Sequence, residues 1–246
     1  MLIGGLFLEK QELLYEGKAK KLYKTSESDV IWVEYLNQAT ALNGKKKDLI
    51  QGKGELNNQI TSLLFSLLKE AGVHNHFIKK LSKNEQLIES VTMFPLEVVL
   101  RNISAGSFSK RFGVKEGTPL ANPIIEFYLK DDKLDDPMMN EEHIQLLELA
   151  TAEEIKKIKK MTLEVNIALQ KVFKKIDIQL IDFKLEFGKQ ADGNILLADE
   201  ISPDTCRLWD VKTGEHLDKD VYRRDLGNLV PVYQEVFERL LKLESI

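Results

Sequence analysis

Two adjacent strands predicted from the sequence carry charged residues that could hold a metal ion. Strict alternation along one apolar run places Asp182, Lys184 and Glu186 on the same face of a strand. A short turn returns the chain as a partner strand, which leads into Asp199 and Glu200. Such alternation is also typical of a solvated sheet face. However, a carboxylate that directly follows a buried strand is costly unless it is paired or metal-bound, and carboxylate oxygens suit Mg²⁺.

A glycine and two lysines near the N-terminus could bind phosphate. Gly17, Lys18 and Lys20 lie at the mouth of an expected hairpin. Glycine lets the backbone approach phosphate oxygens, and lysine supplies a positive charge for them. The segment matches neither a Walker A loop nor a G-x-G-x-x-G loop, and a single Gly-Lys pair is usually only a turn.

Two arginines could bind an anion. Arg101 ends an apolar strand and precedes a Gly/Ser turn that contains Ser107 and opens a short polar helix. A helix N-terminus binds anions, and arginine can contact them through two parallel hydrogen bonds. A capped helix with a solvated basic face fits the same residues equally well. Arg207 follows the second strand of the carboxylate hairpin, where a salt bridge would also explain it.

Covalent and zinc chemistry are not indicated. Cys206 is expected to be a small packed residue, because a reactive thiolate needs a nearby histidine or lysine. The four histidines, His74, His76, His143 and His216, show no zinc spacing with cysteine. A single cysteine cannot form an internal disulfide, which fits a reducing compartment.

The elements that must position these residues fall into two parts. In the first part, β-prone runs surround one helix whose apolar residues recur at helical spacing and which ends at Gly72. The charge run Lys45–Asp48 is typical of a solvated loop. Pro95 interrupts the last strand, so the boundary between the parts is expected at residues 92–96. The expected elements are strands Lys20–Tyr23, Val30–Leu36, Phe77–Leu81 and Gln86–Phe94 and a helix over Leu56–Leu68.

The second part is mixed. Thr151 and Glu154 fit a capping box at the start of its long helix. The expected elements are strands Leu96–Ile103, Ile124–Leu129, Ile178–Phe187 and Ile195–Ile201 and helices over Ile155–Ile176 and Leu229–Leu243. We therefore predict an α+β fold of two lobes, a mostly antiparallel lobe over residues 1–94 and a larger mixed α/β lobe over residues 95–246.

Composition excludes several classes of protein. With 246 residues, of which 43% are hydrophobic and 30% charged, the chain is typical of a globular protein. The formal net charge of -4 argues against a general DNA-binding protein. No apolar run approaches the ~18 residues of a membrane span. A cytoplasmic protein that binds neither nucleic acid nor membrane is expected.

Taken together, these motifs resemble the phosphoribosylaminoimidazole-succinocarboxamide synthase (SAICAR synthetase) family. The match runs in order and spacing from about residue 13 to the C-terminal helix, and the last two motifs are highly specific. The segments that carry it are Glu16–Lys20, Arg101 with Ala105–Ser107, Lys130 with Asp135–Pro137, Ile181–Gly188, and Asp199–Glu200 with Ser202–Asp210.

The resemblance implies both the fold and the reaction. The N-terminal lobe would bind ATP and would be related to protein kinases and ATP-grasp enzymes. The reaction would be a carbon–nitrogen ligation in purine biosynthesis, in which ATP, the carboxylated ribonucleotide CAIR and L-aspartate give SAICAR, ADP and phosphate through an acyl phosphate. We expect ATP and Mg²⁺ as cofactors, small-molecule substrates and a homo-oligomer, a dimer.

The resemblance also implies roles for individual residues. Those expected to contact the ATP phosphates are Gly17, Lys18 and Lys20. Those expected to hold Mg²⁺ are Glu186 and Asp199. Those expected to act catalytically beside the reacting groups are Asp182, Lys184 and Lys18. Those expected to bind or line the substrate site are Arg101, Ser107, Arg207, Lys130 and Asp136. Gln38 stands where many family members carry an aspartate, which puts an acidic role of this loop in doubt.

Three alternatives differ from the synthetase hypothesis in what they require. A small-molecule kinase on the same lobe would release ADP without aspartate. A regulatory module that only binds nucleotide would not need Lys18, Glu186 and Asp199 together. RNA binding through Arg101–Arg111 would require more aromatic residues than Phe108 and Phe112.

Overall fold

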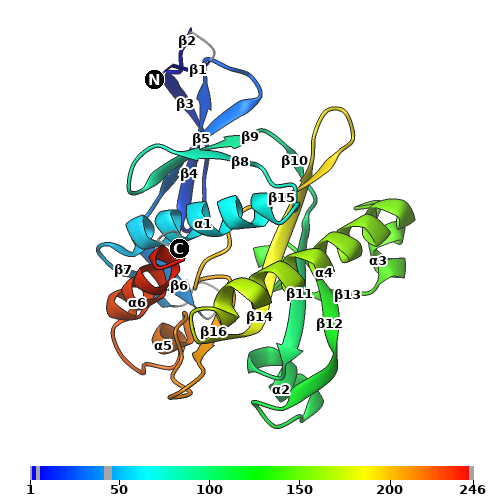
Figure 1. The fold of residues 1–246 in the computed structure, drawn as a ribbon. Coiled ribbons are helices and arrows are strands. Elements are labelled where there is room, and N and C mark those ends of the chain that lie inside the picture. The colour runs from blue at the N-terminus through cyan, green and yellow to red at the C-terminus, as the bar shows by residue number, and fades with distance from the viewer. Residues whose placement is uncertain (1, 4–5, 42–45, 244–246) are drawn as a thin grey trace.

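The larger of two antiparallel sheets carries most of the predicted site residues. In the computed structural model, which describes residues 2–3, 6–41 and 46–243, this sheet has seven strands (Figure 1). Its order is β10-β14-β11-β12-β13, and β15 and β16 also pair with β14. The strands are β10 (Thr92–Met93), β11 (Leu96–Ile103), β12 (Pro119–Leu129), β13 (Met138–Met139), β14 (Ile178–Lys189), β15 (Ile195–Ala198) and β16 (Cys206–Asp210).

The second sheet belongs to the N-terminal part of the chain. Its five strands are antiparallel and follow the order β3-β4-β5-β9-β8. They are β3 (Lys10–Glu16), β4 (Lys20–Thr25), β5 (Val30–Tyr35), β8 (Phe77–Lys80) and β9 (Glu85–Glu89). Two small hairpins accompany it, formed by β1 (Leu2–Ile3) with β2 (Leu6–Phe7) and β6 (Gln38–Ala41) with β7 (Lys46–Leu49).

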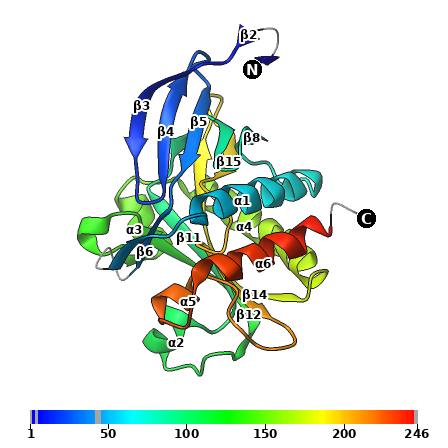
Figure 2. The same ribbon diagram turned by 90° about the vertical axis from the view of Figure 1, so that its left-hand side faces the viewer.

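Helices cover the larger sheet and connect it to the smaller one. Helix α1 crosses between the two sheets, α4 packs along β14, and α6 lies beside α1 (Figures 1 and 2). The helices are α1 (Lys53–Glu70), α2 (Gly106–Phe112), α3 (Glu141–Leu146), α4 (Ala152–Lys174), α5 (Asp220–Arg223) and α6 (Leu229–Leu241), with the 3₁₀ turn η1 (Asp132–Leu134).

Local sequence signals explain the long helices. The Thr151 hydroxyl accepts the Glu154 backbone N–H at 3.2 Å, and the Glu154 carboxylate accepts that of Thr151 at 2.9 Å, which confirms the predicted capping box of α4. Helix α1 ends at Glu70, and Gly72 follows with φ of 85°, which confirms the predicted stop. The apolar faces of both helices are buried against the larger sheet in one main hydrophobic core.

Two of the predicted elements are wrong. The expected strand over residues 86–94 is divided into β9 and β10, because the chain passes from the smaller to the larger sheet between them. The expected loop at Lys45–Asp48 is strand β7 from Lys46 onwards, whose Lys46 ammonium contacts the Tyr222 carbonyl at 2.9 Å; Lys45 itself lies outside the described residues. Strand β7 forms by pairing with β6 in a hairpin, and its residues 47–49 are exposed, as the charge pattern indicates.

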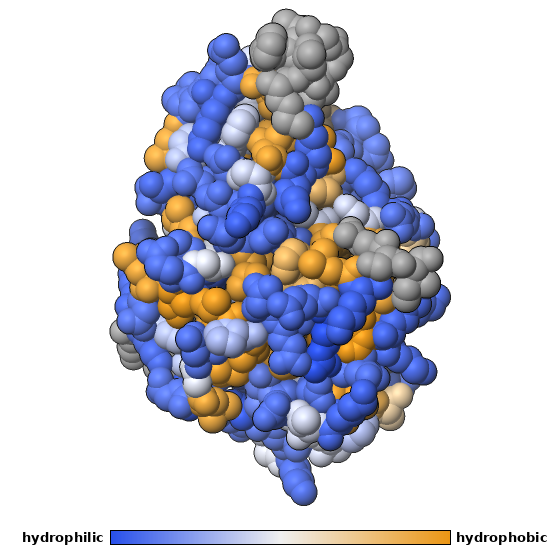
Figure 3. All heavy atoms as spheres, turned by 60° about the vertical axis from the view of Figure 1, so that its left-hand side comes forward, coloured by the Kyte–Doolittle hydropathy of each residue, from blue (hydrophilic) through white to orange (hydrophobic). Residues whose placement is uncertain are grey.

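The predicted division into residues 1–94 and 95–246 stays a prediction, although the sheets divide near it. The five-stranded sheet ends at Glu89 and the larger sheet begins at Thr92. On the face drawn in Figure 3, hydrophobic surface gathers across the middle of the molecule, between more hydrophilic regions above and below. None of the helices in the described part of the chain is long and apolar enough to cross a membrane.

Candidate active site

Strand β14 lies at the centre of the candidate site. Its alternation is confirmed, since one set of side chains packs into apolar clusters and the other set, Asp182, Lys184 and Glu186, makes polar contacts. This polar face is not solvated, because Asp182 is only 3% exposed and Glu186 only 1%. Burial of these carboxylates requires charged partners. The apolar set consists of Ile181, Phe183, Leu185 and Phe187.

Lys184 lies among three carboxylates from three strands or strand ends. Its ammonium is 2.6 Å from Glu186, 3.1 Å from Glu97 on β11 and 3.6 Å from Asp199 after β15. Burial alone would lower the pKa of Lys184, but the carboxylates of Glu186, Asp199 and Glu97 outweigh it and raise this pKa well above its ordinary value. The lysine therefore stays charged.

Two further lysines reach the same acidic groups. Lys20, from β4 of the smaller sheet, lies 2.5 Å from Asp199 and 3.2 Å from Glu200. Lys130, which follows β12, lies 2.5 Å from the second oxygen of Glu186. Burial would raise the pKa of Asp199, but the ammonium groups of Lys20, Lys184 and Lys130 hold it well below its usual range. Four carboxylates thus share three lysines where the two sheets meet.

The donor set at this cluster fits a hard divalent cation. Glu186 and Asp199 offer carboxylate oxygens from neighbouring strands, and β14 pairs with β15 in a register that sets Glu186 against Ala198. Asp199 itself adopts the left-handed conformation, with φ of 57°. Both carboxylates pair with lysine here, so a bound cation would replace the ammonium groups as their counter-charge.

The two lysines of the predicted phosphate-binding turn point to different parts of the structure. Gly17 donates its backbone N–H to the Lys20 carbonyl at 2.8 Å and makes the β3–β4 turn tight. Lys20 points into the carboxylate cluster, whereas Lys18 lies at the tip of the turn, 49% exposed, and pairs with Asp132 at 2.6 Å. Asp132 belongs to η1, so this ion pair joins the turn of the smaller sheet to a loop of the larger sheet.

Asp182 lies between the two predicted anion-binding arginines. In the sheet register it is opposite Arg101 on β11 and opposite Arg207 on β16, where a bulge between Leu180 and Asp182 shifts the pairing. Arg101 contacts Asp182 at 2.8 Å, and Arg207 contacts it at 3.0 Å. The predicted proximity of Arg207 to the hairpin carboxylates is therefore confirmed.

The remaining contacts of Arg101 hold its guanidinium in one orientation. It donates to Glu126 at 2.8 Å and to the Ser107 hydroxyl at 3.1 Å, and it is only 2% exposed. Arg101 therefore orders Ser107, Glu126 and Asp182 through a rigid fork of donors, as lysine could not. Arg101 thus pairs with carboxylates and lines the cavity, and its predicted role in binding an anion stays a prediction.

Arg207 is packed against a glycine. Gly106, at the start of α2, has φ of 55°, and a Cβ atom built there would lie 2.6 Å from the Arg207 Cζ atom. On its other side, Arg207 donates from Nε to Asp220 at 3.0 Å. Glycine is thus required at residue 106 both by the backbone conformation and by the close approach of the guanidinium.

These groups surround a cavity of about 410 Å³. It is large enough for a small anionic metabolite. Positive and negative side chains line it in equal numbers, and four of the positive ones are arginines. The charged lining residues are Glu97, Arg101, Arg111, Asp135, Asp136, Asp182, Lys184, Asp204, Arg207 and Arg223.

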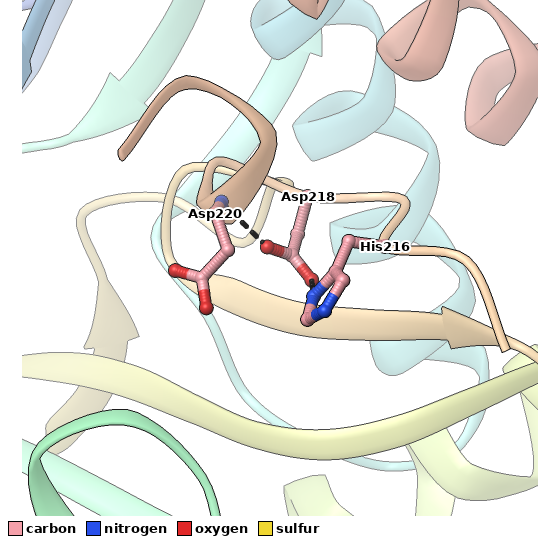
Figure 4. Close-up of side chains that lie close together, drawn as sticks. All are labelled: His216, Asp218 and Asp220. Carbon is pink, nitrogen blue, oxygen red and sulfur yellow. Dashed lines mark hydrogen bonds and ion pairs between the residues drawn. The ribbon is translucent and has the colours of Figure 1, made fainter. Parts of the chain in front are cut away.

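A nearby group of His216, Asp218 and Asp220 has the spacing of metal ligands, but its carboxylates are already occupied (Figure 4). Asp218 accepts the backbone N–H groups of Asp220 at 2.7 Å and Leu208 at 2.8 Å. Asp220 pairs with Arg207 and with two further arginines of its own segment. Since these cations would repel a metal ion, the group instead orients Arg207.

The structure brings most of the predicted site residues together. Cys206 is buried, and burial raises the pKa of its thiol, which agrees with its predicted packing role. Gly17 and Lys18 lie at the rim instead. The predicted residues in or next to the cluster and cavity are Lys20, Arg101, Ser107, Lys130, Asp136, Asp182, Lys184, Glu186, Asp199 and Arg207. Their roles stay predictions.

Sequence reasoning missed other residues of the site. Glu97 could have been found, because it lies on the same strand face as Arg101 when Leu96–Ile103 alternates. Arg223 carried no such signal, since α5 has only four residues. Lys53 was also missed; it is fully buried at the start of α1, and its ammonium lies 2.5 Å from the Asp204 carboxylate.

Fold and site together define an α+β protein in which lysines and carboxylates form a buried cluster beside an arginine-lined cavity, an arrangement typical of an enzyme with anionic substrates. Comparisons with known proteins agree with this class, since residues 13–240 match the family model of SAICAR synthetase. The phosphoribosylaminoimidazole-succinocarboxamide synthase of Enterococcus faecalis is 62% identical over 234 residues, which cover 95% of this chain and 99% of that protein. The corresponding protein of Anoxybacillus flavithermus is 61% identical, with coverage of 95% and 97%. The chain belongs to the SAICAR synthetase family.

Solved structures agree in fold. The phosphoribosylaminoimidazole-succinocarboxamide synthase of Ehrlichia chaffeensis is 47% identical and matches with a TM-score of 0.91, covering 93% of this chain and 98% of that one. A SAICAR synthetase in complex with ADP is 48% identical and matches with a TM-score of 0.90, covering 93% and 97%. The predicted α+β class and the family resemblance are thereby confirmed.

Proposed function

We propose that this enzyme joins the amino group of L-aspartate to the carboxylate of CAIR, using ATP and releasing SAICAR, ADP and phosphate. One feature of the site carries this proposal: strand β14 connects the arginine-lined cavity, through Asp182, to the lysine–carboxylate cluster, through Glu186. A carboxylate activated by ATP needs both kinds of subsite side by side. Family membership and the ADP complex of a relative at 48% identity support the nucleotide.

The lysine–carboxylate cluster is proposed to bind the nucleotide phosphates. Lys20 would contact them from the smaller sheet, and Gly17 and Lys18 would approach from the tip of the same turn. Glu186 and Asp199 would hold Mg²⁺, which when bound neutralises charge on the transferred phosphoryl group. Lys20 would then exchange a carboxylate partner for a phosphate oxygen.

The cavity is proposed to bind CAIR. Arg101, Arg207 and Ser107 present donors for its phosphate, because arginine forks match phosphate geometry. Carboxylates of the lining, Asp136 among them, offer acceptors for the hydroxyl and amino groups of a ribonucleotide. Lys130 pairs with Glu186 in the cluster, from which it would contact the substrate.

The proposed chemistry proceeds through an acyl phosphate. An oxygen of the CAIR carboxylate attacks the terminal phosphorus of ATP, and the bond from this phosphorus to ADP breaks. The amine of aspartate, which loses a proton, then attacks the acyl carbon, and phosphate leaves with the bridging oxygen. Asp182 and Lys184 would orient the reacting carboxylate and the incoming amine. No protein nucleophile is required, which agrees with the burial of Cys206.

Isotope transfer tests this route. CAIR labelled with ¹⁸O in its carboxylate should pass one labelled oxygen to the released phosphate, as measured by mass spectrometry. Label in AMP would indicate an acyl adenylate instead. Release of ADP with each substrate omitted in turn tests the reaction itself, because a small-molecule kinase would release ADP at the full rate without aspartate, and a regulatory module would release none.

We also propose that the enzyme is a homodimer in the cytoplasm whose two lobes divide near residue 94. The dimer is expected together with the family resemblance, the cytoplasm follows from composition and the single cysteine, and the boundary follows from Pro95. Light scattering on the eluting protein measures its mass directly, and a mass near 28.2 kDa, that of one chain, would contradict the dimer.

A further inference from the structure

The backbone of His76 is hydrogen-bonded to both sheets. It lies between α1 and β8, and its N–H donates to the carbonyl of Leu197 on β15 at 2.9 Å. Its own carbonyl accepts the N–H of Glu89 on β9 at 2.7 Å. Since β15 belongs to the larger sheet and β9 to the smaller one, His76 is a point at which the two sheets are joined.

The side chain of His76 continues from this junction towards the proposed metal site. Its Nε2 atom lies 3.2 Å from the backbone carbonyl oxygen of Asp199. Because a carbonyl only accepts, Nε2 carries the proton and donates it. The ring is 3% exposed and packs edge-on against Phe65 of α1, with ring centroids 5.5 Å apart. The imidazole therefore has one orientation, and the Asp199 carbonyl is its partner.

Asp199 needs such a support because of its backbone. It follows the last residue of β15 and has φ of 57°, a conformation that residues with a Cβ atom rarely adopt. The direction of its side chain depends on this conformation, and its two carboxylate oxygens face Lys20 and Lys184. A hydrogen bond that fixes the Asp199 carbonyl also fixes the direction in which the carboxylate points.

We propose that His76 is a positioning residue, which holds the backbone of Asp199 so that its carboxylate faces the site of the nucleotide-bound metal. The inference rests on the proposed function, in which Asp199 is a metal ligand. His76 touches neither substrate nor metal in this proposal. It acts through the peptide of Asp199 and fixes the position of that peptide relative to the junction of the two sheets.

Three variants separate the hydrogen bond from the rest of the side chain. His76→Phe keeps an aromatic ring but removes the donor. His76→Gln keeps a donor, because the glutamine amide nitrogen reaches about as far from the backbone as Nε2. His74→Phe is the matched control, since His74 is exposed, belongs to the same segment and pairs with Leu197 through its backbone only.

The readout is the binding of Mn²⁺, measured by electron paramagnetic resonance in the presence of ADP, together with the KM for CAIR. We expect His76→Phe to weaken Mn²⁺ binding by about 10- to 100-fold, the range for groups that support metal ligands. His76→Gln should restore binding to near the wild-type value, and the KM for CAIR should stay unchanged in both. His74→Phe should bind Mn²⁺ as the wild type does.

Two results would overturn the proposal. One is unchanged Mn²⁺ binding in a folded His76→Phe variant; the other is an equal loss in His76→Phe and His76→Gln. If His76→Phe does not fold, His76→Asn replaces it, because its shorter amide does not reach the Asp199 carbonyl. Asp199→Asn separates the proposed metal site from the proposed role of His76. Unchanged Mn²⁺ binding in Asp199→Asn contradicts the metal site itself. A loss of binding in Asp199→Asn without a loss in His76→Phe contradicts only the role of His76.

Discussion

Substitution of Gly106 by alanine should displace Arg207 and weaken the use of CAIR. The new Cβ atom would lie 2.6 Å from Arg207 Cζ and 2.9 Å from its Nη1 atom, well inside van der Waals contact. The guanidinium must move, and its contact with Asp182 at 3.0 Å comes from the same Nη1 atom. Movement of Arg207 therefore disturbs both its contact with Asp182 and its proposed contact with the CAIR phosphate.

The size of the effect follows from two separate costs. Alanine in a left-handed conformation should lower the free energy of unfolding by roughly 1–2 kcal/mol. Loss of a hydrogen bond to a charged group costs about 1.5–3 kcal/mol, which corresponds to a rise of roughly 10- to 100-fold in the KM for CAIR. The KM for ATP should change little, because Gly106 lies by the cavity and not by the lysine–carboxylate cluster.

Gly113 provides the control for the backbone cost. It caps the other end of α2 with φ of 65°, and a Cβ atom there would meet nothing within 4 Å. Gly113→Ala should therefore lose similar stability in chemical denaturation but keep the KM for CAIR. Equal changes in the KM for CAIR in both variants, or no change in Gly106→Ala, would refute the role of the Arg207 contact.

Four other substitutions test the rest of the site. Glu186→Gln and Asp199→Asn should each lower kcat by roughly 10²-fold, and near-normal turnover of both at saturating Mg²⁺ contradicts the metal assignment. Arg101→Lys should raise the KM for CAIR more than that for ATP, because lysine lacks the fork of donors; steady-state kinetics with an equal rise for ATP would place Arg101 in the other subsite. Asp204→Asn should lower the free energy of unfolding by about 3–5 kcal/mol, because it leaves buried Lys53 without its carboxylate. Burial opposes ionisation of Asp204, but neighbouring lysines lower its pKa. Its stabilising contribution is therefore present above the ordinary carboxyl pKa of about 4 and is lost as the pH falls. Chemical denaturation at pH 5 and pH 3 should show that the free energy of unfolding falls less between these pH values in Asp204→Asn than in the wild type.

Patterns that repeat within one element could be predicted from the sequence. The alternation of β14 and the capping box of α4 depend only on neighbouring residues, and both are confirmed. Strand β3 was missed for a local reason too: all seven of its residues are exposed, so it has no alternating apolar face. The split of the strand after Glu89 depends on which sheet each piece joins, which no local pattern records.

The candidate site shows the same limit. Arg101 and Asp182 could be singled out by residue type, but their pairing is set by the register of β11 against β14, across 81 positions of the chain. Lys18 and Lys20 look equivalent in the sequence. They differ in the structure because only one of them points from the turn towards Asp199, while the other pairs with Asp132.

The charge balance of the lysine–carboxylate cluster explains how a buried site can be ready for a highly charged nucleotide. Lys20, Lys130 and Lys184 pair with Glu186 and Asp199, so neither carboxylate is buried without a partner. In the proposed function, Glu186 and Asp199 would hold the cation, and Lys20, Lys130 and Lys184 would be free to pair with phosphate oxygens. The number of paired charges would then be kept, and the groups proposed to stabilise the transferred phosphoryl group would already surround its site.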